Sequence, residues 1–259
     1  MKLTAEDLSY TYDGTYYLWK NISFTVHKGE IFSLLGSNGC GKSTLLRCLI
    51  GFLKPKTGRV WIEEDNGEKY DALEKPAAFT EKIGYVPQMQ NTAYAFTVRD
   101  YIVMGRAPHL GLFQKPGQKD YRLCDEIMNE MGIYDIRNHS FNTLSGGQQR
   151  QAVIARAIIQ QPEMIIMDEP TNHLDYGNQY RVVKMIEKLS EKGIAVILTT
   201  HMPDHAIYLG SKVGVFCDHR LIVGKADDVI TENILEKIYH IRVHLVYEPL
   251  VKRKICIAE

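Results

Sequence analysis

Apolar and polar positions divide the chain into short apolar runs and longer amphipathic ones. The runs at residues 31–35, 164–167 and 195–198 are short and almost entirely apolar, which is typical of parallel strands buried on both faces of a sheet. The amphipathic stretch at residues 180–189, between the last two runs, predicts a helix. This alternation predicts β-α-β units and an α/β fold.

The N-terminal region predicts an antiparallel β subdomain. Asp13-Gly14 and Lys28-Gly29 are dipeptides typical of hairpin turns. Strands are expected at residues 3–12, 16–26, 58–63 and 83–87.

A helical lobe is expected after residue 88, because the pattern from there to residue 132 is helical and is interrupted by Pro108 and Pro116. Ser145 is the expected N-cap of a helix that runs to Ile159. We therefore expect one domain over residues 1–259, with a core and β subdomain at about 1–88 and 155–240, a helical subdomain at 89–154 and a C-terminal tail at 241–259.

Composition describes an ordinary globular protein. Of 259 residues, 45% are hydrophobic, and 31 Lys and Arg balance 31 Asp and Glu. Nucleic-acid binders usually carry a basic excess, whereas here the only basic run is Lys252-Arg253-Lys254. We therefore expect no nucleic-acid partner.

The sequence contains neither an apolar signal-peptide stretch at its start nor a run of about 20 apolar residues, the length that spans a bilayer. The five cysteines form no C-x-x-C pair, which favours a reducing compartment. We therefore expect a cytoplasmic location.

Residues 36–43 read Gly-Ser-Asn-Gly-Cys-Gly-Lys-Ser and match the phosphate-binding pattern G-x-x-x-x-G-K-S. Glycines let backbone N–H groups approach phosphate oxygens, Lys42 reaches the β- and γ-phosphates, and the Ser43 hydroxyl ligates Mg²⁺. The strand before the loop and the helix after it, beginning near Thr44, supply the expected context. Cys40 is either a small filler or a thiol whose pKa the loop dipoles lower. The pattern predicts that the chain binds a nucleoside triphosphate, but alone it leaves kinases, GTPases and ATPases open.

Leu144-Ser145-Gly146-Gly147-Gln148 narrows that choice, since Asp168 follows Gln148 by 20 residues (168 − 148) after an apolar strand. The chain here resembles the ATP-binding cassette family, whose signature is LSGGQ. The resemblance covers essentially the whole chain and implies a P-loop NTPase (RecA-like) core with an N-terminal antiparallel β subdomain and a helical signature subdomain. It also implies an ATPase with ATP and Mg²⁺ as ligands.

The resemblance implies roles for individual residues. Asp168 would hold Mg²⁺ opposite Ser43, and Glu169 would be the general base, although two adjacent acids can also be a plain surface pair. Gln88, in the Tyr-Val-Pro-Gln stretch, would contact Mg²⁺ and the attacking water. His201 would contact the γ-phosphate from the end of a strand. The expected nucleotide contacts are Tyr12, Gly36, Ser37, Asn38, Gly39, Cys40, Gly41, Lys42, Ser43, Thr44, Ser145, Gly146, Gly147 and Gln148.

For three positions the sequence leaves more than one functional role open. Tyr12 matches the residue that stacks on adenine, but Tyr10, Tyr16 and Tyr17 crowd the same segment. In Asn172-His173-Leu174-Asp175, Asp175 fits the family's D-loop, while the role of His173 is open. His201 and His205 have the spacing of zinc ligands on a helix, yet Pro203 between them disfavours a regular helix.

The resemblance also implies partners. A second copy of the cassette would complete each ATP site with its signature, forming a head-to-tail dimer around two ATP molecules. The stretch Thr97 to His109, with Met104-Gly105-Arg106 at its centre, is similar to importers of iron–siderophore, haem and cobalamin. We therefore expect an importer subunit on the inner face of the cell membrane. Its partners would be transmembrane permease subunits and, indirectly, a periplasmic or extracellular solute-binding protein.

Other function classes stay open. Molybdate and tungstate importers share much of the same pattern. An exporter subunit, or a soluble ATPase of translation or DNA repair, is disfavoured by the single cassette without a fused membrane span or coiled coil. Within residues 88–108, apolar side chains such as Met89, Tyr94, Phe96 and Tyr101 are expected both to fill the lobe and to form a groove for a permease helix.

Overall fold

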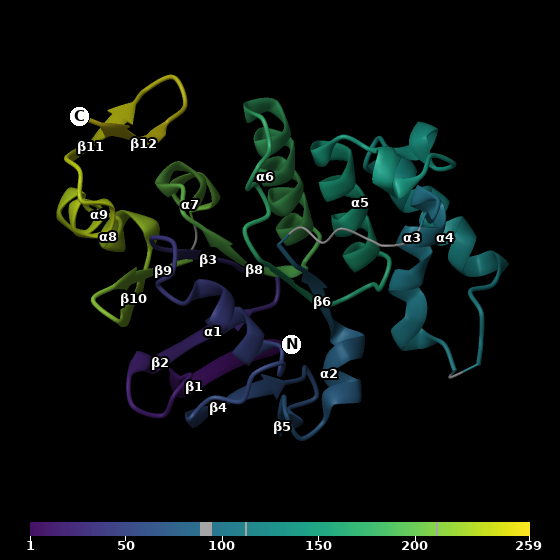
Figure 1. Cartoon of the computed structure of the whole chain (residues 1–259), viewed down its shortest axis with the longest axis horizontal. Coiled ribbons are helices and arrows are strands. Elements are labelled where there is room, and N and C mark those ends of the chain that lie inside the picture. Colours follow the sequence, from purple (N-terminus) through teal and green to yellow (C-terminus); the bar gives the residue numbers. More distant parts are fainter. Residues whose placement is uncertain (89–94, 112, 211) are drawn as a thin grey trace.

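The computed structural model describes residues 1–259 except 89–94, 112 and 211, and its β-strands form three sheets (Figure 1). The strands are β1 (Lys2–Thr11), β2 (Tyr17–His27), β3 (Ile31–Leu35), β4 (Thr57–Glu63), β5 (Lys69–Asp71), β6 (Ile83–Val86), β7 (Met164–Met167), β8 (Ala195–Thr200), β9 (Lys212–Cys217), β10 (Arg220–Gly224), β11 (Val243–Glu248) and β12 (Arg253–Ala258). The α-helices are α1 (Lys42–Leu49), α2 (Pro76–Lys82), α3 (Val98–Val103), α4 (Gln118–Glu130), α5 (Gly146–Ile158), α6 (Tyr176–Glu191), α7 (Pro203–Leu209), α8 (Ala226–Val229) and α9 (Glu232–Tyr239). Short 3-10 helices are η1 (Met104–His109), η2 (Tyr134–Ile136) and η3 (Phe141–Thr143).

The central sheet has the strand order β10-β9-β3-β8-β7-β6, in which only β10 runs antiparallel to its neighbour. Strands β3, β7 and β8 are buried along their whole length, as their apolar runs predict. The N-terminal sheet, β2-β1-β4-β5, is antiparallel. The expected α/β core with an N-terminal antiparallel β subdomain is therefore confirmed.

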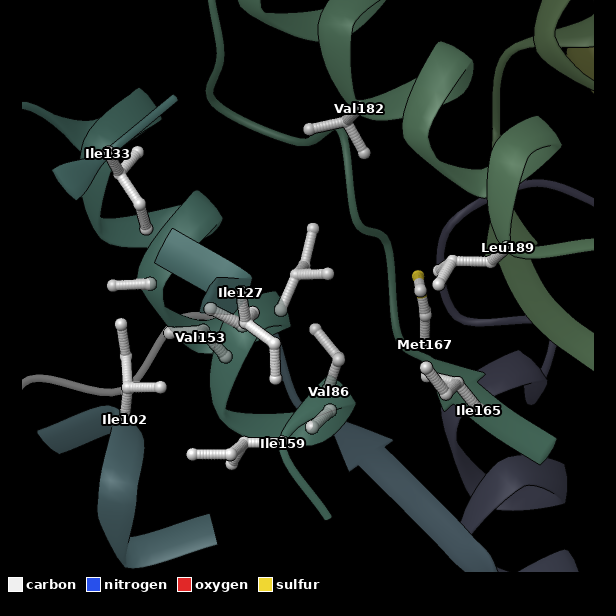
Figure 2. Close-up of a cluster of buried hydrophobic side chains, with 14 of the residues drawn as sticks. Val86, Ile102, Ile127, Ile133, Val153, Ile159, Ile165, Met167, Val182 and Leu189 are labelled. Atoms are coloured by element: carbon white, nitrogen blue, oxygen red, sulfur yellow. The ribbon is translucent and has the colours of Figure 1, made fainter. Parts of the chain in front are cut away.

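Alternate residues of the central strands face two different cores. Ile165 and Met167 of β7 pack with helices α3 to α6, whereas Met164 and Ile166 pack with α1 and the N-terminal sheet. Figure 2 shows the first core, in which Ile102 of α3, Ile127 of α4 and Val153 of α5 gather beside Val86 of β6. The helical lobe thus shares its core with the sheet, and the predicted boundaries at 88/89 and 154/155 stay predictions.

Two details of the predicted elements are wrong. Lys28-Gly29 does not join a hairpin, because β2 and β3 belong to different sheets. Helix α6 begins at Tyr176 rather than residue 180, because the Asp175 side chain accepts a hydrogen bond from Asn178 N and caps it.

The C-terminal tail carries structure that the sequence pattern did not indicate. Strands β11 and β12 form an antiparallel hairpin over residues 243–258, which packs beside α7 and α9 at the far end of the chain (Figure 1). No helix in the described part of the chain is both long enough and apolar enough to cross a membrane.

The C-terminal part of the Thr97–His109 stretch, η1, packs against the C-terminal end of α5. Arg106 forms an ion pair with Asp120 at 2.9 Å and donates to Ile159 O at 3.1 Å. The His109 ring bonds Gln160 O at 2.7 Å. These cationic and polar groups satisfy carbonyls that the end of a helix leaves unpaired. Arg106 is therefore a salt-bridged anchor of η1.

Gly105 lets η1 approach α5 this closely. A Cβ at Gly105 would lie 2.1 Å from Arg156 O and 2.6 Å from Ile159 Cγ2. We expect Gly105→Ala to lower the free energy of unfolding by about 1–3 kcal/mol through overpacking. Gly111→Ala is the matched control, since its nearest contact would be an ordinary 3.8 Å. Urea unfolding of both variants measures the effect, and equal stability of the two would contradict the close packing.

Candidate functional site

The phosphate-binding loop joins the buried strand β3 to α1. Gly39 and Gly41 adopt positive φ angles of 82° and 102°, a region open to glycine with little strain. A Cβ at Gly41 would also lie 2.8 Å from Trp19, and one at Gly36 would lie 2.8 Å from Cys40 Sγ. The glycines are therefore required by the path of the loop.

The Lys42 ammonium lies inside this loop and is almost fully buried. Its Nζ donates to Gly36 O at 2.7 Å and Ser37 O at 2.9 Å and lies 3.8 Å from Glu169 Oε1. A buried positive charge beside the N-terminus of α1 favours binding of an anion.

Cys40 is a filler of the loop. Burial raises the pKa of its thiol, and the nearby Lys42 only partly opposes this. The alternative that the loop lowers the pKa of Cys40 is wrong, because desolvation of the thiolate outweighs the favourable charges.

Two oxygen ligands of the kind that Mg²⁺ prefers meet at the end of β7. Ser43 Oγ donates to Asp168 Oδ1 at 3.0 Å, although the two residues are 125 positions apart. Asp168 is buried, and its Oδ1 also accepts from Thr199 Oγ1 at 2.8 Å. A hydroxyl and a carboxylate in contact fit a Mg²⁺ site.

Glu169 is the point on which the predicted catalytic residues converge. Its Oε1 lies 3.8 Å from Lys42 Nζ and 3.7 Å from His201 Nδ1, and its Oε2 accepts from Gln88 Nε2 at 3.3 Å. Asn172 Nδ2 donates to the same Oε2 at 2.7 Å. The structure thus brings together Lys42, Gln88, Glu169 and His201 from four distant parts of the chain.

The backbone of Glu169 is strained, with φ at 43°, a left-handed conformation that costs a non-glycine residue energy. Two groups hold it there. Glu169 N donates to Thr199 Oγ1 at 2.7 Å, and Arg150 Nη2 donates to Glu169 O at 2.5 Å. Such strain is typical of functional sites, where surrounding contacts keep a side chain in place.

Arg150 is the functional residue that the sequence pattern missed. Its guanidinium, 1% exposed, donates to Pro87 O and Pro170 O at 2.8 Å each, besides Glu169 O. Burial lowers the pKa of Arg150 to about 10, so it stays charged at neutral pH. The available signal was a charged residue on the apolar face of the predicted helix after Ser145. Thr199, a hydroxyl in a wholly buried strand, was a second such signal.

The signature residues lie at the N-terminus of α5 and face solvent. Ser145 Oγ accepts from Gln148 N at 3.3 Å, and Gln148 Oε1 accepts from Ser145 N at 3.1 Å, a capping box. Ser145 and Gly146 are exposed, and Gly147 is packed against Asn178. Among the described residues, the hydrogen bonds between the side chains and backbone N–H groups of Ser145 and Gln148 stay within the signature, and the position of a Gly146 Cβ has open space around it.

The four N-terminal tyrosines differ in exposure. Tyr10 is buried against Trp19, and Lys20 covers the ring of Tyr17. Tyr12 is 69% exposed, and its hydroxyl bonds Thr44 Oγ1 of α1 at 2.8 Å. Tyr12 is therefore the exposed ring that is tied to the phosphate-binding helix, although Tyr16 is exposed as well.

His201 and His205 do not act as a pair. His205 Nδ1 bonds Thr171 Oγ1 at 3.2 Å, whereas His201 Nδ1 faces Glu169. In the described residues, no group of three or more His, Cys, Asp or Glu side chains is arranged to hold a metal ion. His173 is exposed with φ at 59°, and its role stays open.

An apolar hollow of about 290 Å³ lies below η1. Met104 and Pro108 line one side, and Phe52, Phe79 and Tyr85 line the other. Phe52 is 70% exposed and meets the edge of Tyr85.

Only part of the expected 88–108 groove is found here: Tyr101 is buried and stacked on Phe141, so its assignment to a surface is wrong. Phe96 is half-buried against the same core, and Met89 and Tyr94 lie outside the described residues.

Comparisons with known proteins identify the family of the chain. The sequence profile of the ABC transporter family matches residues 19–172. The chain is 31% identical to the molybdate import ATP-binding protein MolC of Haemophilus influenzae over 92% of its length and 88% of the relative. It is 30% identical to the ferric enterobactin transport ATP-binding protein FepC of Escherichia coli over 96% of its length and 91% of the relative. An inward-facing structure of a metal-chelate type ABC transporter matches with a TM-score of 0.86 and 29% identity, covering 99% of this chain and 97% of that one.

Replacement of Arg150 tests whether its hydrogen bonds stabilise the backbone of the site. Arg150→Met keeps much of the volume but leaves the carbonyls of Pro87 and Pro170 without their donor, and it removes one of the two donors to Glu169 O, the other being Asn172 N. We expect a loss of about 3–5 kcal/mol in the free energy of unfolding, since each buried unsatisfied group costs about 1–3 kcal/mol. Arg122→Met, at an exposed position of α4, is the control and should cost less than about 0.5 kcal/mol. Denaturant unfolding distinguishes the two, and equal losses would show that Arg150 does not support the site.

Proposed function

Because this chain belongs to the ABC transporter family and is an ATPase of that family, we propose that it powers a membrane importer for a metal chelate. Iron–siderophore, haem and cobalamin are the chelates in question. The observation that carries the proposal is the convergence of Lys42, Gln88 and His201 on the Glu169 carboxylate. This cluster provides a base, a cation and two polar groups beside a phosphate-binding loop, which are the parts that ATP hydrolysis requires.

ATP is the substrate of the proposed site. The amides of the loop from Gly36 to Thr44 and the Lys42 ammonium bind its phosphates, and the exposed ring of Tyr12 stacks on its adenine. Ser43, Asp168 and Gln88 would hold Mg²⁺, which would supply positive charge to neutralise the phosphate oxygens. Glu169 accepts the proton of the attacking water, and His201 contacts the γ-phosphate.

A second copy of the cassette completes each site in this proposal. Ser145 and Gly146 present an exposed helix N-terminus, which favours an anion, and the half-buried Gln148 and the buried Gly147 follow them in the first turn of the helix. The Ser145 signature of one copy would face the phosphate-binding loop of the other. Two ATP molecules are then enclosed between two chains, and hydrolysis opens the dimer.

The permease contact is proposed at the apolar hollow lined by Phe52, Tyr85, Met104 and Pro108. An exposed apolar patch is typical of a partner surface. Tyr85 lies three residues before Gln88, so movement at the hollow reaches the catalytic cluster over a short path. In this proposal the subunit lies on the inner face of the cell membrane, bound to the permease. A solute-binding protein delivers the cargo to the permease from the outer side.

The cargo is supported by the relatives. FepC serves ferric enterobactin and the matched transporter structure is of the metal-chelate type. A molybdate importer is the second candidate, because MolC is equally similar. ATP-dependent uptake by this subunit with its permease in vesicles, comparing a ferric siderophore with molybdate, decides between them.

Replacement of the proposed base tests the hydrolytic site. Glu169→Gln keeps the shape of the side chain but cannot accept a proton, so we expect kcat for ATP to fall by about 10²–10⁴-fold with binding retained. In the presence of ATP, Glu169→Gln should elute from gel filtration as a stable ATP-bound dimer. Wild-type turnover by Glu169→Gln would overturn the assignment of Glu169.

Phe52→Asp tests the permease contact. A charge in the hollow should reduce ATP-driven uptake by about tenfold or more, while the isolated subunit keeps its ATP affinity. The control is Leu250→Asp, a substitution at another strongly exposed apolar residue, which should leave uptake unchanged. If both variants transport at the wild-type rate, the permease binds elsewhere.

A further inference from the structure

The loop that carries His201 is tied to the C-terminal segment of the chain. The Tyr239 hydroxyl, at the end of α9, donates to His201 O at 2.8 Å. Three residues further on, Asp204 Oδ1 accepts from Cys256 N of β12 at 3.0 Å and lies 4.0 Å from Arg253 Nη1. Residues after position 238 therefore hold a loop that ends more than thirty positions earlier.

The His201 ring needs such support. Its Nδ1 is buried and finds no hydrogen-bond partner among the residues that the structure describes, and its distance of 3.7 Å to Glu169 Oε1 is too long for a hydrogen bond. The ring therefore takes its position from its own backbone. The backbone at His201 lies just beyond β8, where the sheet no longer pairs it.

Tyr239 is well suited to fix that backbone. Helix α9 is anchored by the buried side chains of Leu235 and Ile238, and the half-buried Tyr239 ring packs on the same core. Burial, with smaller effects of the Cys256 and Cys40 thiols, raises the pKa of Tyr239. The hydroxyl thus keeps its proton and stays a donor at physiological pH.

The next segment is held from the opposite side. His205 of α7 bonds Thr171 Oγ1 at 3.2 Å, and Thr171 follows Glu169 by two positions. The segment from His201 to His205, which includes the start of α7, is therefore bonded both to the segment that follows Glu169 and to the C-terminal segment.

We propose that Tyr239 is a positioning residue for hydrolysis, which fixes the peptide of His201 so that its ring stands beside Glu169 and the γ-phosphate. The C-terminal segment then contributes to the rate of ATP hydrolysis through the backbone of His201. This inference rests on the proposed role of His201.

Tyr239→Phe removes the hydroxyl and keeps the ring, so the packing of α9 is preserved. We expect kcat for ATP to fall about fivefold, the effect of one lost hydrogen bond, with KM for ATP unchanged and the variant fully folded at the assay temperature. Tyr247→Phe, at an exposed tyrosine of β11, is the matched control and should hydrolyse ATP at the wild-type rate. A Tyr239→Phe enzyme with wild-type kcat would overturn the inference, and so would a lower melting temperature with no change in kcat.

A double-mutant cycle separates positioning from general structural support. Under single-turnover conditions, Tyr239→Phe should slow hydrolysis in the wild-type background but have no further effect in His201→Ala, because the residue acts through His201. Equal slowing in both backgrounds would overturn the inference while leaving the role of His201 intact. Wild-type hydrolysis by His201→Ala would instead overturn the proposed role of His201 and this inference with it.

Discussion

The buried guanidinium of Arg150 is the interaction on which the site depends. One side chain of α5 donates hydrogen bonds to backbone carbonyls that follow β6 and β7. It thereby joins the signature helix, the segment of Gln88 and the segment of Glu169 in one unit. The strained backbone of Glu169 is stable because Arg150 and Asn172 N donate to its carbonyl and Thr199 accepts from its N–H.

The central sheet supplies the second constraint. The loops after β3, β6, β7 and β8 carry Lys42, Gln88, Asp168 with Glu169, and His201. Because these strands are parallel neighbours, their carboxyl ends lie at one edge, where open α/β sheets bind ligands. A charged site of this kind is therefore assembled by strand order, with the residues proposed to be catalytic held on short loops from a buried scaffold.

The same architecture connects the site to its surroundings. Gln88 donates to the Glu169 carboxylate and lies three residues after Tyr85, which lines the apolar hollow. His201 lies beside that carboxylate, and its backbone carbonyl accepts a hydrogen bond from Tyr239 at the end of α9. Two peripheral surfaces thus reach Glu169 through one residue each. The exposed signature at Ser145 is a third surface, for which a second chain is the proposed partner.

The sequence by itself determined the elements and motifs that depend on neighbouring residues. The apolar runs of β3, β7 and β8, the cap at Ser145 and the glycines of the phosphate-binding loop are local features, since propensity, capping and steric freedom act within a few positions. The family resemblance then named Lys42, Asp168, Glu169 and His201 without showing how they meet.

Only the tertiary structure decided which distant residues touch. In the sequence, Arg150 is an ordinary helix residue and Thr199 an ordinary strand residue. In the folded chain, Arg150 donates to the carbonyl of Glu169 and Thr199 accepts from its N–H. Tyr101 turned inward while Phe52 stayed exposed, and the tail folded as a hairpin against α7. These outcomes depend on contacts between segments far apart in the chain. Local sequence patterns do not predict the free energy of such contacts.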